Sequence, residues 1–201
     1  SSGAYSSIGR TEKRELLTGE LLWSRNYSSS GYSHDVLSIL DGDYLYIIGR
    51  ANYGDWRIEK VQKEDGVIVW RTIRDTGFWW SQSALKITQD DEFLYVTGRR
   101  SETNDDNSRS KIIKVKKSDG IIIQSSLRTL SPNAYEFIRD IHRYGDYLYA
   151  FGERQLSKSE QYILRYEKLD LELNVVEEIE FDPAIGNSRV NGAFFDNGYI
   201  Y

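Results

Sequence analysis

A short phrase of aromatic and aliphatic residues, ending in glycine where it is complete, recurs four times along the chain and constrains its fold more than any other feature. It reads Asp-Tyr-Leu-Tyr-Ile-Ile-Gly at 43–49, Glu-Phe-Leu-Tyr-Val-Thr-Gly at 92–98, Asp-Tyr-Leu-Tyr-Ala-Phe-Gly at 146–152 and Gly-Tyr-Ile-Tyr at 198–201. A repeat with a period of about 50 residues predicts an array of equivalent structural units. We therefore expect one domain over residues 1–201.

Each unit is predicted to contain four β-strands, A to D, and the first complete unit illustrates the pattern. Its expected strands span 36–40, 44–49, 56–62 and 67–70. Asp-Gly at 41–42 and 65–66 separates hydrophobic runs, which is a strong hairpin signal because glycine accepts a positive φ. Equivalent C–D turns are expected at Thr18-Gly19 and at 118–120. In the fourth unit we expect Asn174, which tolerates the same conformation, to take the glycine's place.

Strand B is apolar at consecutive positions, from Tyr44 to Ile48 in the first complete unit, so both of its faces should be buried. The chain also has 15 Tyr, 5 Trp and 7 Phe, residues that strands favour. Four-stranded sheets stacked radially around an axis bury both faces of their strands. The sequence therefore predicts an all-β fold, specifically a four-bladed β-propeller.

The spacings between the equivalent glycines indicate how the ring would close. Wrapping the chain from Tyr201 to Ser1 places Gly3 in register with Gly49, Gly98 and Gly152, and the four spacings then account for all 201 residues. We expect the N-terminal strands C and D to pair with the C-terminal strands A and B, which leaves no exposed edge. Half of a larger propeller is the alternative. The predicted blades span 186–201 plus 1–27, 32–74, 79–129 and 133–182.

Two C–D hairpins carry a further signature, in which tryptophan follows the turn glycine by four residues. These hairpins, at 13–23 with Trp23 and at 60–70 with Trp70, resemble those of the PQQ-like β-propeller repeat family. In that family the tryptophan docks on the neighbouring blade. Gln124 and Glu178 occupy the expected tryptophan positions of the other two units. The family includes quinone-dependent dehydrogenases with bound calcium and non-catalytic scaffolds, so the resemblance implies fold and leaves activity open.

Composition limits the partners. The net charge of −5 gives no basic field for nucleic acid, and no apolar run approaches the roughly 20 residues that span a bilayer. The chain lacks cysteine, and its two histidines, His34 and His142, lie in different blades without metal-ligand spacing. We expect no cofactor and no metal site. The compartment stays open between the cytoplasm and an extracellular location reached with a targeting segment since removed.

Candidate ligand-binding residues gather in the loops that enter strand A and leave strand B, the end of a propeller that usually binds ligands. Aromatic faces beside polar side chains are what recognition of a protein or glycan needs. Arg50 and Arg99 follow the strand B glycines, with Arg154 one place later in its unit, and could bind carboxylate or phosphate or form salt bridges between blades. The predicted ligand-binding set is Tyr32, His34, Arg50, Trp56, Trp79, Trp80, Arg99 and Tyr135.

A carboxylate pair such as Asp35 with Glu136 could meet across the channel as a general acid and base, but such pairs are common among 31 acidic residues. We therefore expect a non-catalytic binding or scaffold module. The alternatives are a polysaccharide hydrolase or lyase using these two carboxylates, and a structural subunit of an extracellular or viral assembly. The sequence does not determine the oligomeric state.

Overall fold

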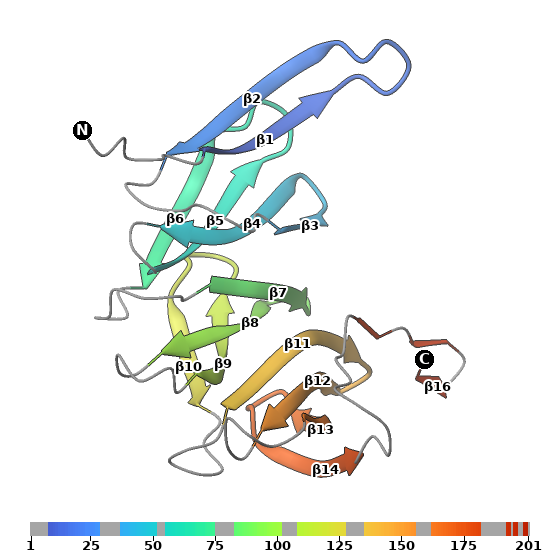
Figure 1. Cartoon of the computed structure of the whole chain (residues 1–201). Coiled ribbons are helices and arrows are strands. Elements are labelled where there is room, and N and C mark those ends of the chain that lie inside the picture. Colours follow the sequence, from blue (N-terminus) through green and yellow to red (C-terminus); the bar gives the residue numbers. More distant parts are fainter. Residues whose placement is uncertain are drawn as a thin grey trace, which may run out of the picture.

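The fold was analysed in a computed structural model, which describes residues 8–28, 37–51, 55–74, 83–101, 108–127, 135–155, 162–181, 192–193, 195–196 and 199–200. Within these ranges the chain forms β-strands and no helix, so it contains no helix that could cross a membrane. The strands make three four-stranded antiparallel sheets and two separate two-stranded sheets (Figure 1). The predicted all-β class is confirmed.

Each sheet is built from strands that follow one another in the chain. The two-stranded sheets contain β1 (Ile8–Arg14) with β2 (Leu21–Ser28), and β15 (Phe195–Asp196) with β16 (Tyr199–Ile200). The four-stranded sheets contain β3 (Leu37–Asp41), β4 (Tyr44–Ala51), β5 (Asp55–Gln62) and β6 (Ile68–Arg74); β7 (Ser83–Gln89), β8 (Phe93–Ser101), β9 (Ser108–Lys116) and β10 (Ile122–Leu127); and β11 (Tyr135–Tyr144), β12 (Tyr147–Gln155), β13 (Ile163–Asp170) and β14 (Val175–Phe181). These three sheets fall within the ranges predicted for three blades.

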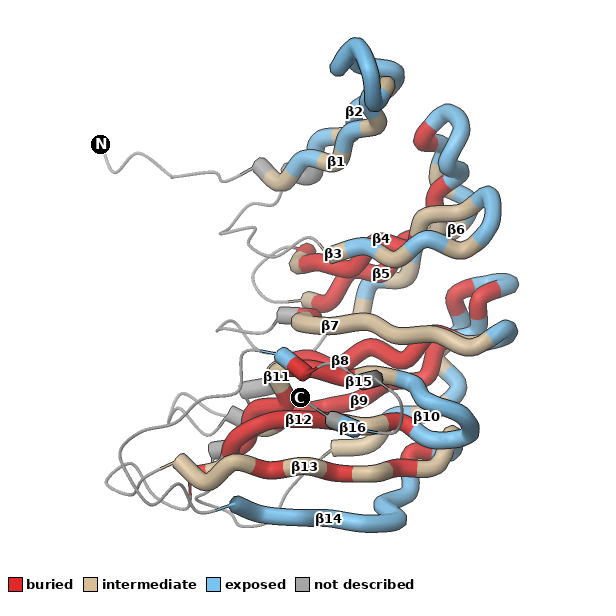
Figure 2. The backbone as a smooth tube through the Cα atoms, turned by 90° about the vertical axis from the view of Figure 1, so that its right-hand side faces the viewer, coloured by how far each residue is buried: buried red, intermediate tan, exposed pale blue. Residues whose placement is uncertain are grey.

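The sheets stack face to face, which buries both faces of the second strand in each (Figure 2). In β4 the adjacent residues Ile47 and Ile48 are both 0% exposed, as the unbroken apolar run predicts. One core lies between the sheets β3–β6 and β7–β10 and includes Trp56. A second core, which includes Leu148, lies between the sheets β7–β10 and β11–β14. The first strands, β3, β7 and β11, contact each other in sequence along one edge of the stack.

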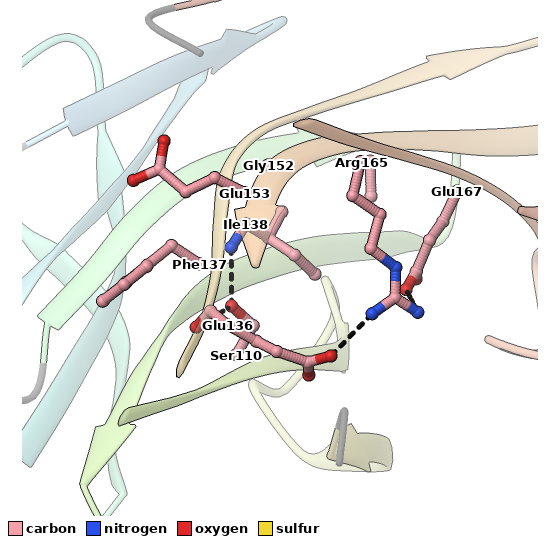
Figure 3. Close-up of a pocket in the computed structure, with 9 residues that line it drawn as sticks. Ser110, Glu136, Phe137, Ile138, Gly152, Glu153, Arg165 and Glu167 are labelled. Carbon is pink, nitrogen blue, oxygen red and sulfur yellow. Dashed lines mark hydrogen bonds and ion pairs between the residues drawn. The ribbon is translucent and has the colours of Figure 1, made fainter. Parts of the chain in front are cut away.

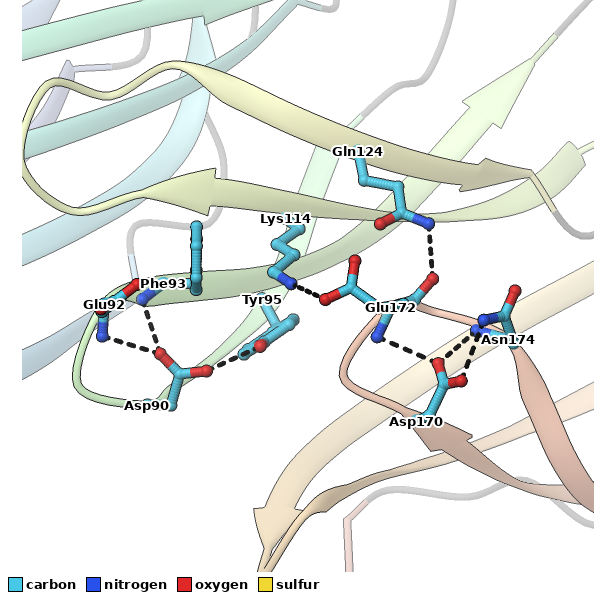
Figure 4. Close-up of polar contacts among 9 residues, drawn as sticks. All are labelled: Asp90, Glu92, Phe93, Tyr95, Lys114, Gln124, Asp170, Glu172 and Asn174. Carbon is cyan, nitrogen blue, oxygen red and sulfur yellow. Dashed lines mark hydrogen bonds and ion pairs between the residues drawn. The ribbon is translucent and has the colours of Figure 1, made fainter.

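One contact recurs between successive sheets: a side chain after the C–D turn donates a hydrogen bond to a backbone carbonyl in the next C–D turn. The three bonds run from Trp23 Nε1 to Lys63 O (3.1 Å), from Trp70 Nε1 to Lys117 O (2.9 Å) and from Gln124 Nε2 to Glu172 O (2.5 Å). Figure 4 shows the third. The amide of Gln124 thus replaces the indole donor, so the unit keeps its contact without tryptophan.

The last C–D turn differs from the prediction. The residue with positive φ is Leu173, at 61°, and not Asn174. Leu173 N donates to Asp170 O, whereas Gly66 N donates to Gln62 O, so the last turn is one residue shorter. The strain of the positive φ at Leu173 is offset because the side chain of this residue is buried in the second core.

The shorter turn also shifts the last position equivalent to tryptophan. Lys60 lies opposite Trp70 and Lys114 opposite Gln124, and the equivalent Lys168 lies opposite Glu177. The prediction that Glu178 stands at this position is therefore wrong by one residue.

The predicted joining of the two chain ends in one sheet is not formed between the described residues. The hairpin β1–β2 docks on the sheet β3–β6 at one end of the stack, while β14 lies at the other end (Figure 1). The C-terminal strands pair only with each other, and Ala193 just before them donates its backbone N–H to Asp140 of β11. The units are thus repeated and stacked, and a closed ring remains a prediction.

Candidate functional site

The arginines predicted to line one rim lie at the C-terminal ends of the strand B elements. Arg50 is near the end of β4, Arg99 near the end of β8 and Arg154 near the end of β12. The arrows of these three strands point to the same side of the stack (Figure 1). The guanidinium carbon of Arg99 lies 4.8 Å from the centroid of the Phe137 ring in the next sheet. Arg154 pairs with Glu180 at 2.8 Å. These contacts hold two of the arginines in place at the rim.

Phe137 connects two arginines at this rim. Arg139 lies 4.9 Å from the same ring centroid, and its Nη2 is 2.5 Å from Oε1 of the buried Glu153. A partly exposed cation over an aromatic ring is stabilised by about 0.5–1 kcal/mol. The Arg99–Phe137–Arg139 group therefore stiffens the junction between the sheets β7–β10 and β11–β14.

Beneath the rim, the guanidinium of Arg165 contacts three carboxylates, and Figure 3 shows two of them, Glu136 and Glu167. Arg165 of β13 lies 2.6 Å from Glu136, 2.5 Å from Glu167 and 2.9 Å from Glu178. Glu136 and Glu167 are 4% and 2% exposed. Burial raises the pKa of Glu136 above its ordinary value, although the positive charge of Arg165 opposes this shift. Burial thus favours the protonated form of Glu136 more than solvent would.

A small cavity adjoins these charges, with room for about one water molecule. Its lining includes Glu136 and Glu153, each of which has one buried carboxylate oxygen without a hydrogen-bond partner among the described residues. At the cavity, Ser110 Oγ donates to Glu136 O (3.0 Å) and accepts from Ile138 N (2.6 Å). This hydroxyl fastens two sheets together.

The strand B glycine of this unit, Gly152, also lines the cavity, and no larger residue fits there. A Cβ atom built on Gly152 would lie 1.9 Å from Phe137 O. The last glycine of the repeated phrase thus allows β11 to pass close to β12 at the rim.

A strand C motif in this region is visible in the sequence but is absent from the predictions above. Arg-x-Glu occurs as Arg10 with Glu12, Arg57 with Glu59 and Arg165 with Glu167, at equivalent register positions. The pairs are separated by 2.5, 3.8 and 2.5 Å. The motif could have been found by aligning the units on strand C instead of strand B.

The structure distributes the predicted site residues unevenly. Trp56 is 1% exposed, and its indole donates to Arg99 O at 3.3 Å, so it packs between sheets and offers no surface to a ligand. Of Tyr135, which begins β11, the structure describes only the backbone. Outside the described residues lie Tyr32, His34, Asp35, Trp79 and Trp80.

The predicted catalytic pair is therefore represented by Glu136 alone, which is buried and bound to Arg165. His142 lies 3.2 Å from Asp140, and within the described ranges no group of three His, Cys, Asp or Glu residues could hold a metal ion. No protein-family model matches this chain, and neither does any curated protein.

Proposed function

We propose that the protein is a non-catalytic binding or scaffold module of the β-propeller type, which recognises a protein or glycan at the rim formed by the strand B ends and adjoining loops. The observation that carries this proposal is the pair of cation–π contacts at the rim, in which Arg99 and Arg139 both lie against the ring of Phe137. A rigid framework lowers the conformational entropy cost of presenting recognition residues. The recognition residues in this proposal include Trp79 and Trp80, which precede β7 in the sequence and lie outside the described residues.

The burial of Glu136 and its ion pair with Arg165 favour a recognition function over hydrolysis. A raised pKa is a property of a general acid, but a general acid must also reach its substrate. Glu136 is 4% exposed, and one of its oxygens is engaged by Arg165. Its adjoining cavity accommodates about one water molecule, far less than a sugar ring needs.

In the architecture we propose, the four units are blades, with β3, β7 and β11 nearest the axis. Contacts between these strands and the repeated hydrogen bonds between C–D hairpins support this arrangement. A closed four-bladed ring would need β1–β2 and β15–β16 to join in one sheet. Half of a larger propeller would keep the same contacts within the stack.

Binding measurements test the proposed rim. A glycan array and pull-down of candidate protein partners should detect a ligand for the wild-type protein, and Trp79→Ala/Trp80→Ala should weaken its binding at least tenfold. Tyr144→Ala is the control, because Tyr144 is an exposed aromatic at the last position of β11, at the opposite end of its sheet. Equal binding by all three proteins would contradict the assigned rim.

A further inference from the structure

The two end faces of the stack differ from the internal faces that they match by position. Within the described residues, each internal C–D hairpin contacts the turn of the hairpin that follows it. Among the described strands, none forms a sheet of this kind before the turn at 15–19, and none forms one on the outer face of β13 and β14. These two faces are therefore the halves of one further contact of the same type.

The first half, the turn at 15–19, is apolar where the other two glycine-containing C–D turns, at 63–66 and 117–120, are polar. Leu16 and Leu17 precede Gly19 by the same spacing at which Lys63 and Glu64 precede Gly66. Their exposed fractions are 93% and 91%, the largest of any bulky apolar residues described. Leaving two adjacent leucines in water forgoes about 2 kcal/mol or more each of burial energy.

The second half, the outer face of β14, is likewise apolar where the equivalent face of β6 is polar. Ile179 and Phe181 occupy the register positions that Thr72 and Arg74 occupy in β6. Thr72 uses its hydroxyl to donate to Gly120 O in the next turn at 2.6 Å. Ile179 and Phe181 cannot donate, and they are 38% and 54% exposed. An apolar strand face thus matches an apolar turn.

A polar group that would set the register is also present. Lys13 and Lys60 donate to turn carbonyls of the next hairpin, and Lys114 pairs with Glu172 there at 2.6 Å. Lys168 occupies the same register position in β13. Glu177 lies opposite Lys168 in β14, where the other units have a tryptophan or glutamine donor, and an ionised carboxylate has no proton to donate. Lys168 is therefore the group that can donate a hydrogen bond to a carbonyl of the 15–19 turn.

The Arg-x-Glu motif identifies which side of β1–β2 is left open. The side chains of Arg57 and Glu59 are 7% and 0% exposed, whereas those of Arg10 and Glu12 are 46% and 25% exposed. The same motif is therefore covered in an internal sheet and open to solvent in the N-terminal hairpin. A sheet placed on this side would restore the internal arrangement.

We propose that the β1–β2 hairpin of a second copy of this chain docks on the outer face of β13 and β14, giving head-to-tail association. A second copy can occupy this face without rearrangement because the two halves lie at opposite ends of the stack (Figure 1). Such an interface is heterologous, so it forms either a closed ring of chains or a filament. The inference rests on the end faces and is independent of the proposed rim.

Crosslinking tests the proposal cleanly because the chain contains no cysteine. Leu16→Cys and Glu177→Cys place one thiol on each half, at positions equivalent to Lys63 and Trp23. When these two variants are mixed and oxidised, we expect a disulfide-linked species of twice the chain mass. Each variant alone should give several-fold less, and so should Leu16→Cys mixed with Asp146→Cys, which is exposed in another turn.

Two outcomes would overturn the proposal. One is a disulfide of single-chain mass in a double variant that carries both Leu16→Cys and Glu177→Cys, with no product from the mixture of single variants, which would show that each chain closes on its own hairpin. The other is a mixture that yields no more product than the Asp146→Cys control.

A second measurement uses the apolar face itself. The sedimentation mass of the wild type should rise above 23.4 kDa with concentration, and Ile179→Asp/Phe181→Asp should keep it at that value. Both side chains are partly exposed in the single chain, so the unfolding midpoint of the variant should stay close to that of the wild type. Concentration-dependent association that persists unchanged in this variant would also overturn the proposal.

Discussion

Replacing Gly120 by alanine should destabilise the protein far more than replacing Gly19, although the two glycines occupy equivalent turns. Their φ angles are 77° and 73°, so an alanine suffers about the same left-handed strain in both, about 1–2 kcal/mol. Alanine also restricts the unfolded chain, which returns about 0.4–1 kcal/mol. The net cost expected for Gly19→Ala is therefore about 1 kcal/mol.

Gly120 carries an additional steric cost because the preceding sheet, β3–β6, rests on it. A Cβ at this position would lie 2.6 Å from Trp70 Cε3 and 2.7 Å from Thr72 Oγ1, whereas nothing lies within 4 Å at Gly19. Moving the indole aside costs about 1–3 kcal/mol of packing and weakens two hydrogen bonds, of about 1 kcal/mol each. Those bonds run from Trp70 Nε1 to Lys117 O and from Thr72 Oγ1 to Gly120 O. Gly120→Ala should thus cost about 3–5 kcal/mol.

Urea unfolding followed by tryptophan fluorescence measures the difference as a shift in midpoint. The Trp70→Ala background provides the internal control, because the cost of Gly120→Ala should fall markedly once the indole is removed and only the contact with Thr72 Oγ1 remains. If the two glycine substitutions cost the same within about 0.5 kcal/mol, or if the excess is undiminished without Trp70, the docking of Trp70 on this turn is refuted.

Three further predictions concern polar contacts. Although burial opposes it, hydrogen bonds from the Tyr95 hydroxyl and two backbone N–H groups lower the pKa of Asp90. Its contribution to stability is therefore full above the unfolded pKa of about 3.9 and is lost as the pH falls through the lower folded value. Asp90→Asn should reduce the fall of the urea unfolding midpoint at acid pH and should cost about 1 kcal/mol of unfolding free energy at pH 7. Tyr95→Phe should reproduce part of this effect. An unchanged fall of the midpoint at acid pH in Asp90→Asn would contradict the assignment. Glu136 has the opposite sign: burial raises its folded pKa, so the folded state binds more protons and stability falls as the pH rises through that value. Glu136→Gln should remove this fall of stability with rising pH, as measured by urea unfolding at a series of pH values. A fall that persists in the variant would show that another group causes it. Finally, Gln124→Ala should cost about 1 kcal/mol in urea unfolding by leaving Glu172 O without its side-chain donor, while Gln124→Trp should restore the contact made in the other units; equal stability of the alanine variant and the wild type would show that the amide contributes nothing.

Most of the strand pattern could be predicted because it depends on local chemistry. The apolar run at 44–48 requires two covered faces, and glycines such as Gly66 mark turns by their freedom to adopt positive φ. The last turn could not be predicted from local chemistry, because the strain at Leu173 is tolerated only through burial in a core made by another sheet. Its one-residue deletion also shifted the expected position of Glu178 to Glu177.

The candidate site was only partly predictable. Arg99 and Glu136 stand out by their positions after strand B and before strand A, but their partners lie elsewhere in the chain. Phe137 and Arg165 join the site because β11 and β13 lie in one sheet, and the Phe137 ring is reached by Arg99 from the preceding sheet. Trp56 shows the reverse case: an aromatic next to a loop was expected to bind a ligand, and stacking buried it.

The sequence by itself determined the unit: four strands, two of them joined by a turn that favours glycine, repeated about every 50 residues. These features follow from backbone preferences and hydrophobic periodicity, which act over a few residues. Only the tertiary structure decided which charges are buried together around Arg165, which turn each tryptophan meets, and which apolar residues remain exposed at the ends. Those outcomes depend on how one sheet packs against the next, because desolvation and side-chain hydrogen bonding are set by neighbours that are distant in the chain.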